Sequence, residues 1–106
     1  DLMVKGVLIV DTRVASEYVE QRIRGAVNIP YKEKSAKRPD FDGRLDRFDL
    51  GKLPRNKDTP VIFYCNAGEC WKSYKASKTA LKAGYTKVYW LRGGIPEWKN
   101  NGLPVE

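Results

Sequence analysis

The sequence predicts a single α/β domain in which helices cover both faces of a mainly parallel sheet. Three short runs of strand length, residues 7–10, 61–64 and 87–91, are each followed by a segment with helical spacing. Alternating strands and helices imply crossover connections and parallel pairing. With 106 residues, of which 42% are apolar, the chain is long enough for one domain with its own core. We therefore treat residues 1–106 as one domain.

The N-terminal half begins with a strand and continues through shorter elements. Residues 7–10 are a continuous apolar run, which is typical of a strand buried on both faces. Residues 14–21 have the pattern of a short helix, and residues 23–30 that of a turn and a short strand closed by proline. The charged segment 31–40 is expected to be a loop. The apolar spacing within 41–50 predicts an amphipathic helix.

The C-terminal half repeats the strand and helix alternation twice. Residues 61–64 are a buried strand, and residues 73–83 have a helical pattern with Gly84 just past the end. Residues 87–91 are a further strand, and residues 95–100 a last short helix. Because ligands of parallel sheets bind at the carboxyl ends of strands, we expect the functional site at that edge.

Both cysteines of the chain lie between the strand 61–64 and the helix that follows it. Cys65 comes directly after the strand, and Cys70 lies five residues later, close to the start of the helix. A helix N-terminus presents unpaired backbone N–H groups and the positive end of the helix dipole. Such a turn favours a thiolate or a bound anion. The spacing also permits a disulfide if the turn folds back.

The composition excludes several classes of site. The chain has no histidine, which removes Ser-His-Asp and Cys-His catalysis and the commonest metal ligand. Two cysteines are too few for a disulfide scaffold or a zinc site with four cysteine ligands. We therefore expect no metal and no cofactor.

The net charge of +7, from 20 Lys and Arg against 13 Asp and Glu, indicates a solvated basic surface that favours small anions. We prefer this interpretation to a nucleic-acid surface because the basic residues are spread along the chain. No apolar run approaches the roughly 18–20 residues that cross a bilayer, and no signal peptide is visible. The compartment, cytoplasmic or periplasmic, and the oligomeric state stay open.

Four segments in this order resemble the rhodanese-like sulfurtransferases over nearly the whole chain. The first segment is the strand 7–10 with Asp11-Thr12-Arg13 and Glu17-Tyr18 after it, and the second is Ile23 to Pro30. The third consists of the strand 61–64, Cys65, the loop and the helix that follows, and the fourth is Leu91 to Trp98. Each piece alone is weak evidence, and the four together are strong. The resemblance implies a small α/β domain with a largely parallel five-stranded sheet flanked by helices.

The same resemblance implies transfer of sulfane sulfur. Cys65 would take the outer sulfur of thiosulfate or polysulfide as a persulfide and pass it to a thiol or to cyanide. The surrounding positions would bind the substrate: Asn66, Ala67, Gly68, Glu69, Trp71, Lys72, Ser73 and Arg92. No separate general base is required, because sulfite or a thiolate is a good leaving group.

The loop departs from the family pattern in length, in its closing cation and in its second cysteine. Six residues separate Cys65 from Lys72-Ser73, where the family usually has four before a basic residue, often arginine. Lysine offers a point charge in place of a planar fork. Cys70 is either a resolving thiol, which would attack the Cys65 persulfide, or a small packing residue beside Trp71.

Three other functions stay open from the sequence. The chain could be a non-catalytic rhodanese-like binding or regulatory module, or a dithiol redox protein that uses Cys65 and Cys70. A phosphatase-like enzyme of the same fold is less favoured, because no arginine closes the loop and Glu69 would repel phosphate. Among the flanking residues we expect Asp11, Arg13 and Glu17 to form a structural set of ion pairs.

Overall fold

A computed structural model describes residues 6–66 and 70–106 of the chain. Its centre is a sheet of four strands in the order β2-β1-β3-β4, all paired in parallel. The strands are β1 (Leu8–Asp11), β2 (Val27–Asn28), β3 (Val61–Tyr64) and β4 (Val88–Leu91). The predicted α/β class and the parallel pairing are confirmed.

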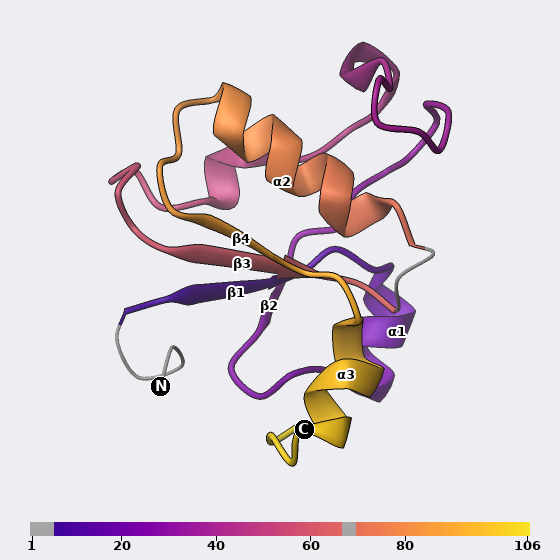
Figure 1. Ribbon diagram of the computed structural model, residues 1–106, viewed down its shortest axis with the longest axis vertical. Coiled ribbons are helices and arrows are strands. Elements are labelled where there is room, and N and C mark those ends of the chain that lie inside the picture. Colours follow the sequence, from indigo (N-terminus) through magenta and orange to yellow (C-terminus); the bar gives the residue numbers. More distant parts are fainter. Residues whose placement is uncertain (1–5, 67–69) are drawn as a thin grey trace.

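Helices lie on both faces of the sheet, as Figure 1 shows. The helix α2 (Lys72–Lys82) covers one face, and α1 (Ala15–Glu20) and α3 (Gly94–Asn100) lie on the other. The helix α2 ends where the sequence predicts, because Gly84 takes a φ of 101°, which glycine adopts without strain. Within residues 6–66 and 70–106, no helix is long and apolar enough to cross a membrane.

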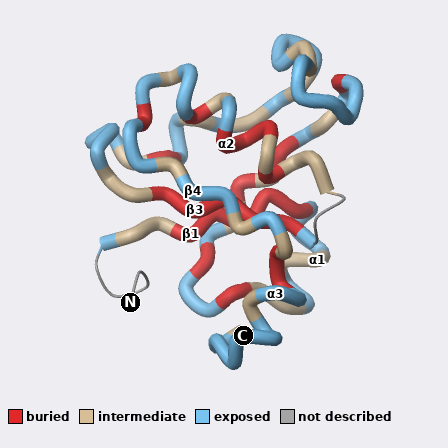
Figure 2. Tube along the Cα trace, viewed as in Figure 1, coloured by how far each residue is buried: buried red, intermediate tan, exposed pale blue. Residues whose placement is uncertain are grey.

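Alternate residues of the central strands supply two separate apolar clusters. Val10, Val61 and Phe63 pack with Ala76 and Ala80 of α2 on one face. On the other face, the alternate strand residues Ile9, Ile62 and Tyr64 pack with Tyr18 of α1 and with Ile95 and Trp98 of α3. Figure 2 shows the buried residues concentrated along β1, β3 and α2, whereas β4 is largely unburied. Burial on both faces explains why β1 and β3 are continuous apolar runs.

The predicted helix over residues 41–50 is wrong. This segment contains two short 3₁₀ turns instead, η2 (Gly43–Leu45) and η3 (Leu50–Lys52). The side chains of Asp42 and Asp49 each accept a hydrogen bond from the backbone N–H two residues on, at 3.1 and 3.0 Å. Aspartate side chains that bind the local backbone in this way compete with helical hydrogen bonding.

The expectation of five strands is also wrong for the part of the chain that the structure describes, where the sheet has four. Two further pairings are isolated antiparallel bridges, between Ile23 and Val105 and between Lys32 and Arg47. The bridge between Ile23 and Val105 does not extend into a strand for two reasons. Pro104, next to Val105, has no N–H to donate. After Ile23 the chain turns, and the Ala26 N–H donates to the Ile23 carbonyl.

Candidate active site

Cys65 lies at the carboxyl end of β3, one of the two central strands, and is 1% exposed. The neighbouring strand β1 ends at the same edge. There the N–H and the hydroxyl of Thr12 both donate to the Tyr64 carbonyl, at 3.0 and 2.9 Å. The predicted convergence of strand ends at the cysteine is therefore present.

The two cysteines are joined by a disulfide, and their Cα atoms are 6.3 Å apart. The two positions differ in exposure, because Cys65 is buried whereas Cys70 is partly exposed. In this state neither sulfur is a free nucleophile. The pair is a candidate for reversible oxidation at the sheet edge.

A chain of two hydrogen bonds leads from β4 to the Cys65 sulfur. The indole N–H of Trp90 donates to the Ser73 Oγ at 2.9 Å. The same Oγ lies 3.1 Å from the Cys65 Sγ. A disulfide sulfur carries no proton, so the Ser73 hydroxyl must be the donor in this contact. The bond from Trp90 leaves the Ser73 proton free to point at the sulfur.

Asn66, the residue after Cys65, is held by side chains from the start of the chain. The side-chain Nδ2 of Asn66 donates to the Glu17 Oε2 at 2.9 Å. Its side-chain Oδ1 accepts from the Arg13 Nη1 at 3.4 Å. Arg13 itself is paired with buried Asp11, with Nη2 and Oδ2 separated by 2.7 Å. Asp11 and Arg13 thus form the expected ion pair, whereas Glu17 binds Asn66.

Charge and burial shift the pKa values of Arg13 and Tyr64 in this network. Burial alone would lower the pKa of Arg13, but the hydrogen bonds and charge of Asp11 outweigh it and raise the pKa. Burial raises the pKa of Tyr64 and nearby Asp11 raises it further, so the phenol stays protonated. Its hydroxyl donates to the Asp11 Oδ2 at 2.8 Å. The result is a buried, hydrogen-bonded support for the Cys65–Asn66 backbone.

Gly94, the first residue of α3, allows that helix to approach the cysteine closely. A Cβ at this position would lie 2.2 Å from the Cys65 carbonyl oxygen and 2.7 Å from that of Asn66. Its φ of 59° is in the left-handed region that favours glycine. Only a residue without a side chain permits this contact.

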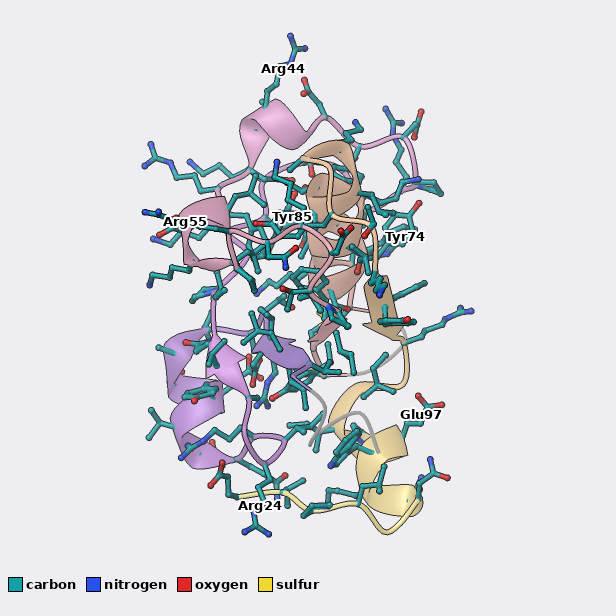
Figure 3. All side chains as sticks on the ribbon, turned by 90° about the vertical axis from the view of Figure 1, so that its left-hand side faces the viewer. Arg24, Arg44, Arg55, Tyr74, Tyr85 and Glu97 are labelled. Atoms are coloured by element: carbon teal, nitrogen blue, oxygen red, sulfur yellow. A yellow bond between two sulfur atoms is a disulfide. The ribbon has the colours of Figure 1, made fainter. Side chains whose placement is uncertain are left out.

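An aromatic cluster lies beside the disulfide. The ring of Tyr74 is 5.4 Å from that of Trp71 and 5.2 Å from that of Trp90, and both contacts are edge to face. Figure 3 shows Tyr74 where α2 meets β4. The guanidinium of Arg92 lies 5.9 Å from the Trp90 ring centre. This cluster supplies an apolar wall with a cation at its edge.

The structure places four of the predicted site residues beside one another, where the end of β3 meets the start of α2: Cys65, Asn66, Cys70 and Ser73. Lys72 begins α2 and is partly buried, and Arg92 is exposed directly after β4. Ala67, Gly68 and Glu69 lie outside the described residues. Across the described ranges, 6–66 and 70–106, no group of three or more Cys, Asp or Glu side chains is placed to hold a metal ion.

Two residues at the site were not predicted from the sequence. Trp90 lies in the predicted strand 87–91, whose pattern assigns no role to its side chain, yet its N–H orients the Ser73 hydroxyl from 17 positions away. Gly94 lies in the segment Leu91 to Trp98, and the sequence pattern assigns it no role of its own. Its role depends on how α3 crosses the end of β3, and no local pattern carries that information.

Comparison with known proteins agrees with this geometry. The family model of the rhodanese-like domain matches residues 1–101. A sulfurtransferase from Allochromatium vinosum is 31% identical over 99 residues, which cover 93% of this chain and 78% of that protein. The chloroplastic thiosulfate sulfurtransferase 16 of Arabidopsis thaliana is 32% identical over 110 residues, or 100% of this chain and 85% of that protein.

Solved structures give the same result. A rhodanese from E. coli, determined with anions, superposes with a TM-score of 0.62 at 30% identity and covers 94% of this chain and 96% of its own. A rhodanese-like domain from Anabaena has a TM-score of 0.68 at 25% identity, with 94% and 98% covered.

The fold and the site together define a small parallel α/β domain with a disulfide-bonded cysteine pair at the end of a central strand. The chain belongs to the rhodanese-like family, and relatives that match it are named sulfurtransferases.

Proposed function

We propose that this protein is a sulfurtransferase that carries sulfane sulfur on Cys65. The observation that supports this most is the position of Cys65 at the carboxyl end of β3, with its sulfur within hydrogen-bond distance of the Ser73 hydroxyl. In a chain of this family that position is the natural place for the sulfur-accepting thiolate. The thiolate forms when the disulfide with Cys70 is reduced.

The proposed reaction consists of two displacements at sulfur. The Cys65 thiolate attacks the outer sulfur of thiosulfate, the S–S bond of thiosulfate breaks, and sulfite leaves with the electron pair. A thiolate or cyanide then attacks the terminal sulfur of the persulfide, and the Cys65 thiolate leaves. A polysulfide donor reacts in the same way, with a shorter polysulfide as leaving group.

The described residues favour a negatively charged sulfur at this position. The Ser73 hydroxyl is a donor aimed at the Cys65 sulfur and stabilises the thiolate both as nucleophile and as leaving group. Lys72 and Arg92 add cations near the same strand ends, and the net charge of +7 attracts anionic donors. The related E. coli rhodanese was solved with anions, which supports an anionic substrate for this fold.

The test compares single cysteine variants after reduction. Cys65→Ser should abolish sulfur transfer from thiosulfate or polysulfide to cyanide, because it removes the nucleophile. Cys70→Ser should still accept sulfur, because Cys65 and its donor from Ser73 remain. Transfer retained in Cys65→Ser would refute the proposal, and a protein without transfer in any form would favour a non-catalytic module.

The disulfide favours a second candidate function, in which Cys70 is a resolving thiol. The Cys70 thiolate would attack the Cys65 sulfur of the persulfide, release hydrosulfide and close the disulfide. One sulfane sulfur is then reduced to sulfide while the two cysteines are oxidised. This candidate predicts sulfide release from the persulfide form of the natural chain in the absence of any external acceptor, and none from Cys70→Ser.

A further inference from the structure

The disulfide is asymmetric in its access to solvent. Cys65 is 1% exposed, because it lies under the start of α3 and between strand ends. Cys70 is partly exposed, next to the first turn of α2. An incoming thiol must reach a sulfur along the S–S axis, so access decides which of the two sulfurs is attacked.

Among residues 6–66 and 70–106, the disulfide is also asymmetric in its hydrogen bonding, because a side-chain donor reaches the Cys65 sulfur and none reaches the Cys70 sulfur. The Cys65 sulfur has the Ser73 hydroxyl at 3.1 Å, and the Trp90 N–H holds that hydroxyl in the donating orientation. The Ser77 hydroxyl donates to the Ser73 carbonyl at 2.8 Å and ties the first turn of α2 together. Charge that develops on the Cys65 sulfur therefore meets a donor that is already in place.

From these two asymmetries we infer that the protein undergoes directed thiol–disulfide exchange, in which a reducing thiol attacks Cys70 and Cys65 is the leaving thiolate. The inference rests on the proposed function for its purpose, because this exchange restores the thiolate that sulfur transfer requires. Trp90 and Ser73 are positioning residues for the exchange.

The step balances without any further reactant. A monothiol RS⁻ attacks the Cys70 sulfur, the Cys65–Cys70 bond breaks, and the products are the mixed disulfide RS–Cys70 and the Cys65 thiolate. A second RS⁻ attacks the sulfur of R in that mixed disulfide and releases the Cys70 thiolate with RSSR. The protein gains two electrons, and two thiols are oxidised to one disulfide.

The sulfur that the thiol attacks first decides whether Cys65 is free to accept substrate after the first step. Attack at Cys65 would require the thiol to enter a buried position and would place a bulky mixed disulfide on the sulfur that must accept substrate. Attack at Cys70 leaves Cys65 free and charged after the first step. The leaving thiolate is the one that the Ser73 donor stabilises, and a better stabilised thiolate leaves faster.

The first experiment locates the mixed disulfide in the natural chain. The oxidised protein is mixed with glutathione, quenched in acid at short times in the presence of N-ethylmaleimide, and digested for peptide mass mapping. We expect glutathione on Cys70 and the maleimide on Cys65, in excess of about tenfold over the opposite pattern at the earliest times. Glutathione mainly on Cys65, or equally on both, would overturn the inference, as would a Cys65–Cys70 disulfide that does not form under oxidising conditions.

The second experiment measures the rate of reduction in a matched pair of variants. Trp90→Phe removes the N–H that orients Ser73, and Trp98→Phe removes an indole N–H that donates only to the Pro104 carbonyl at 2.7 Å. We expect reduction by glutathione to slow by on the order of 3–10-fold in Trp90→Phe, since part of a hydrogen bond to a charged sulfur is lost. Trp98→Phe should keep the natural rate.

Equal rates in the two variants would refute the role of Trp90, and Ser73→Ala provides the same test if Trp90→Phe does not fold. If the second exchange is too fast for a mixed disulfide to accumulate, these rates decide the inference. Neither experiment contains a sulfur donor. A protein that shows directed exchange but forms no persulfide would therefore refute the proposed function and leave this inference intact.

Discussion

The contact between Gly94 and the Cys65 carbonyl gives the sharpest test of how the fold positions the nucleophile. Gly94→Ala places a Cβ 2.2 Å from that oxygen, at a residue with a φ of 59°. The left-handed conformation costs alanine about 1–2 kcal/mol. The clash adds about 1–3 kcal/mol, the range for overpacking of a filled site. We therefore expect the free energy of unfolding to fall by about 2–5 kcal/mol.

Gly25→Ala is the matched control, because it has the backbone penalty without the clash. Gly25 has a φ of 86°, and nothing lies within 4 Å of an added Cβ. We expect a loss of only about 1–2 kcal/mol there. The difference between the two variants isolates the steric contact with Cys65.

The assay combines urea denaturation with the rate of persulfide formation on the reduced protein. A displacement of Cys65 of the order of 1 Å reduces a rate by about 100-fold, so Gly94→Ala should lose at least tenfold in rate even where it is folded. Gly25→Ala should retain the natural rate. Equal stability and equal rates in the two variants would refute the argument that α3 sets the position of Cys65.

Substitutions at three further sites test polar contacts that hold the fold together. Hydrogen bonds from neighbouring residues outweigh burial and lower the pKa of Asp46 to about 2, from 3.8. Its contribution is therefore complete above about pH 4 and is lost as the pH falls toward 2. Asp46→Asn should lose about 1 kcal/mol at pH 7, a figure reduced for solvent screening of this partly exposed carboxylate, and should weaken the loss of stability between about pH 4 and pH 2 in denaturation curves. An unchanged loss over that range would contradict the assignment. Tyr64→Phe removes the hydroxyl that donates to Asp11 and accepts a backbone N–H; it should cost about 1–3 kcal/mol, and unchanged stability would count against that role. Lys75 is 0% exposed, with its Nζ 2.7 Å from the Glu33 carboxylate. Lys75→Met should destabilise by about 3–5 kcal/mol, and adding Glu33→Gln should recover part of the loss; no recovery would contradict a paired buried charge.

Most of the fold could be predicted because its strands carry a strong local signal. The runs in β1 and β3 are apolar on both faces of the sheet, and the residues after them mark the strand ends. The segment 41–50 could not be predicted in the same way. Its apolar spacing resembled a helix, but the side chains of Asp42 and Asp49 bind the backbone locally and close 3₁₀ turns instead.

The position of the nucleophile could be predicted, whereas the groups that support it could not. Cys65 follows directly from a strand, a turn and a helix in sequence. The donor from Trp90 to Ser73, the support of Asn66 by Arg13, and the approach of Gly94 all join segments that are far apart in the chain. They depend on the packing of β4 and α3 against the end of β3, which is a tertiary property.

The most direct test of the central claim is the mass of the reduced protein after incubation with thiosulfate, followed by peptide mapping. We expect a gain of one sulfur atom on the peptide that contains Cys65, lost on addition of a thiol, in Cys70→Ser, and no gain in Cys65→Ser. A gain of sulfur in Cys65→Ser, or no gain in mass in Cys70→Ser with thiosulfate or polysulfide, would contradict the assignment of Cys65 as the sulfur carrier.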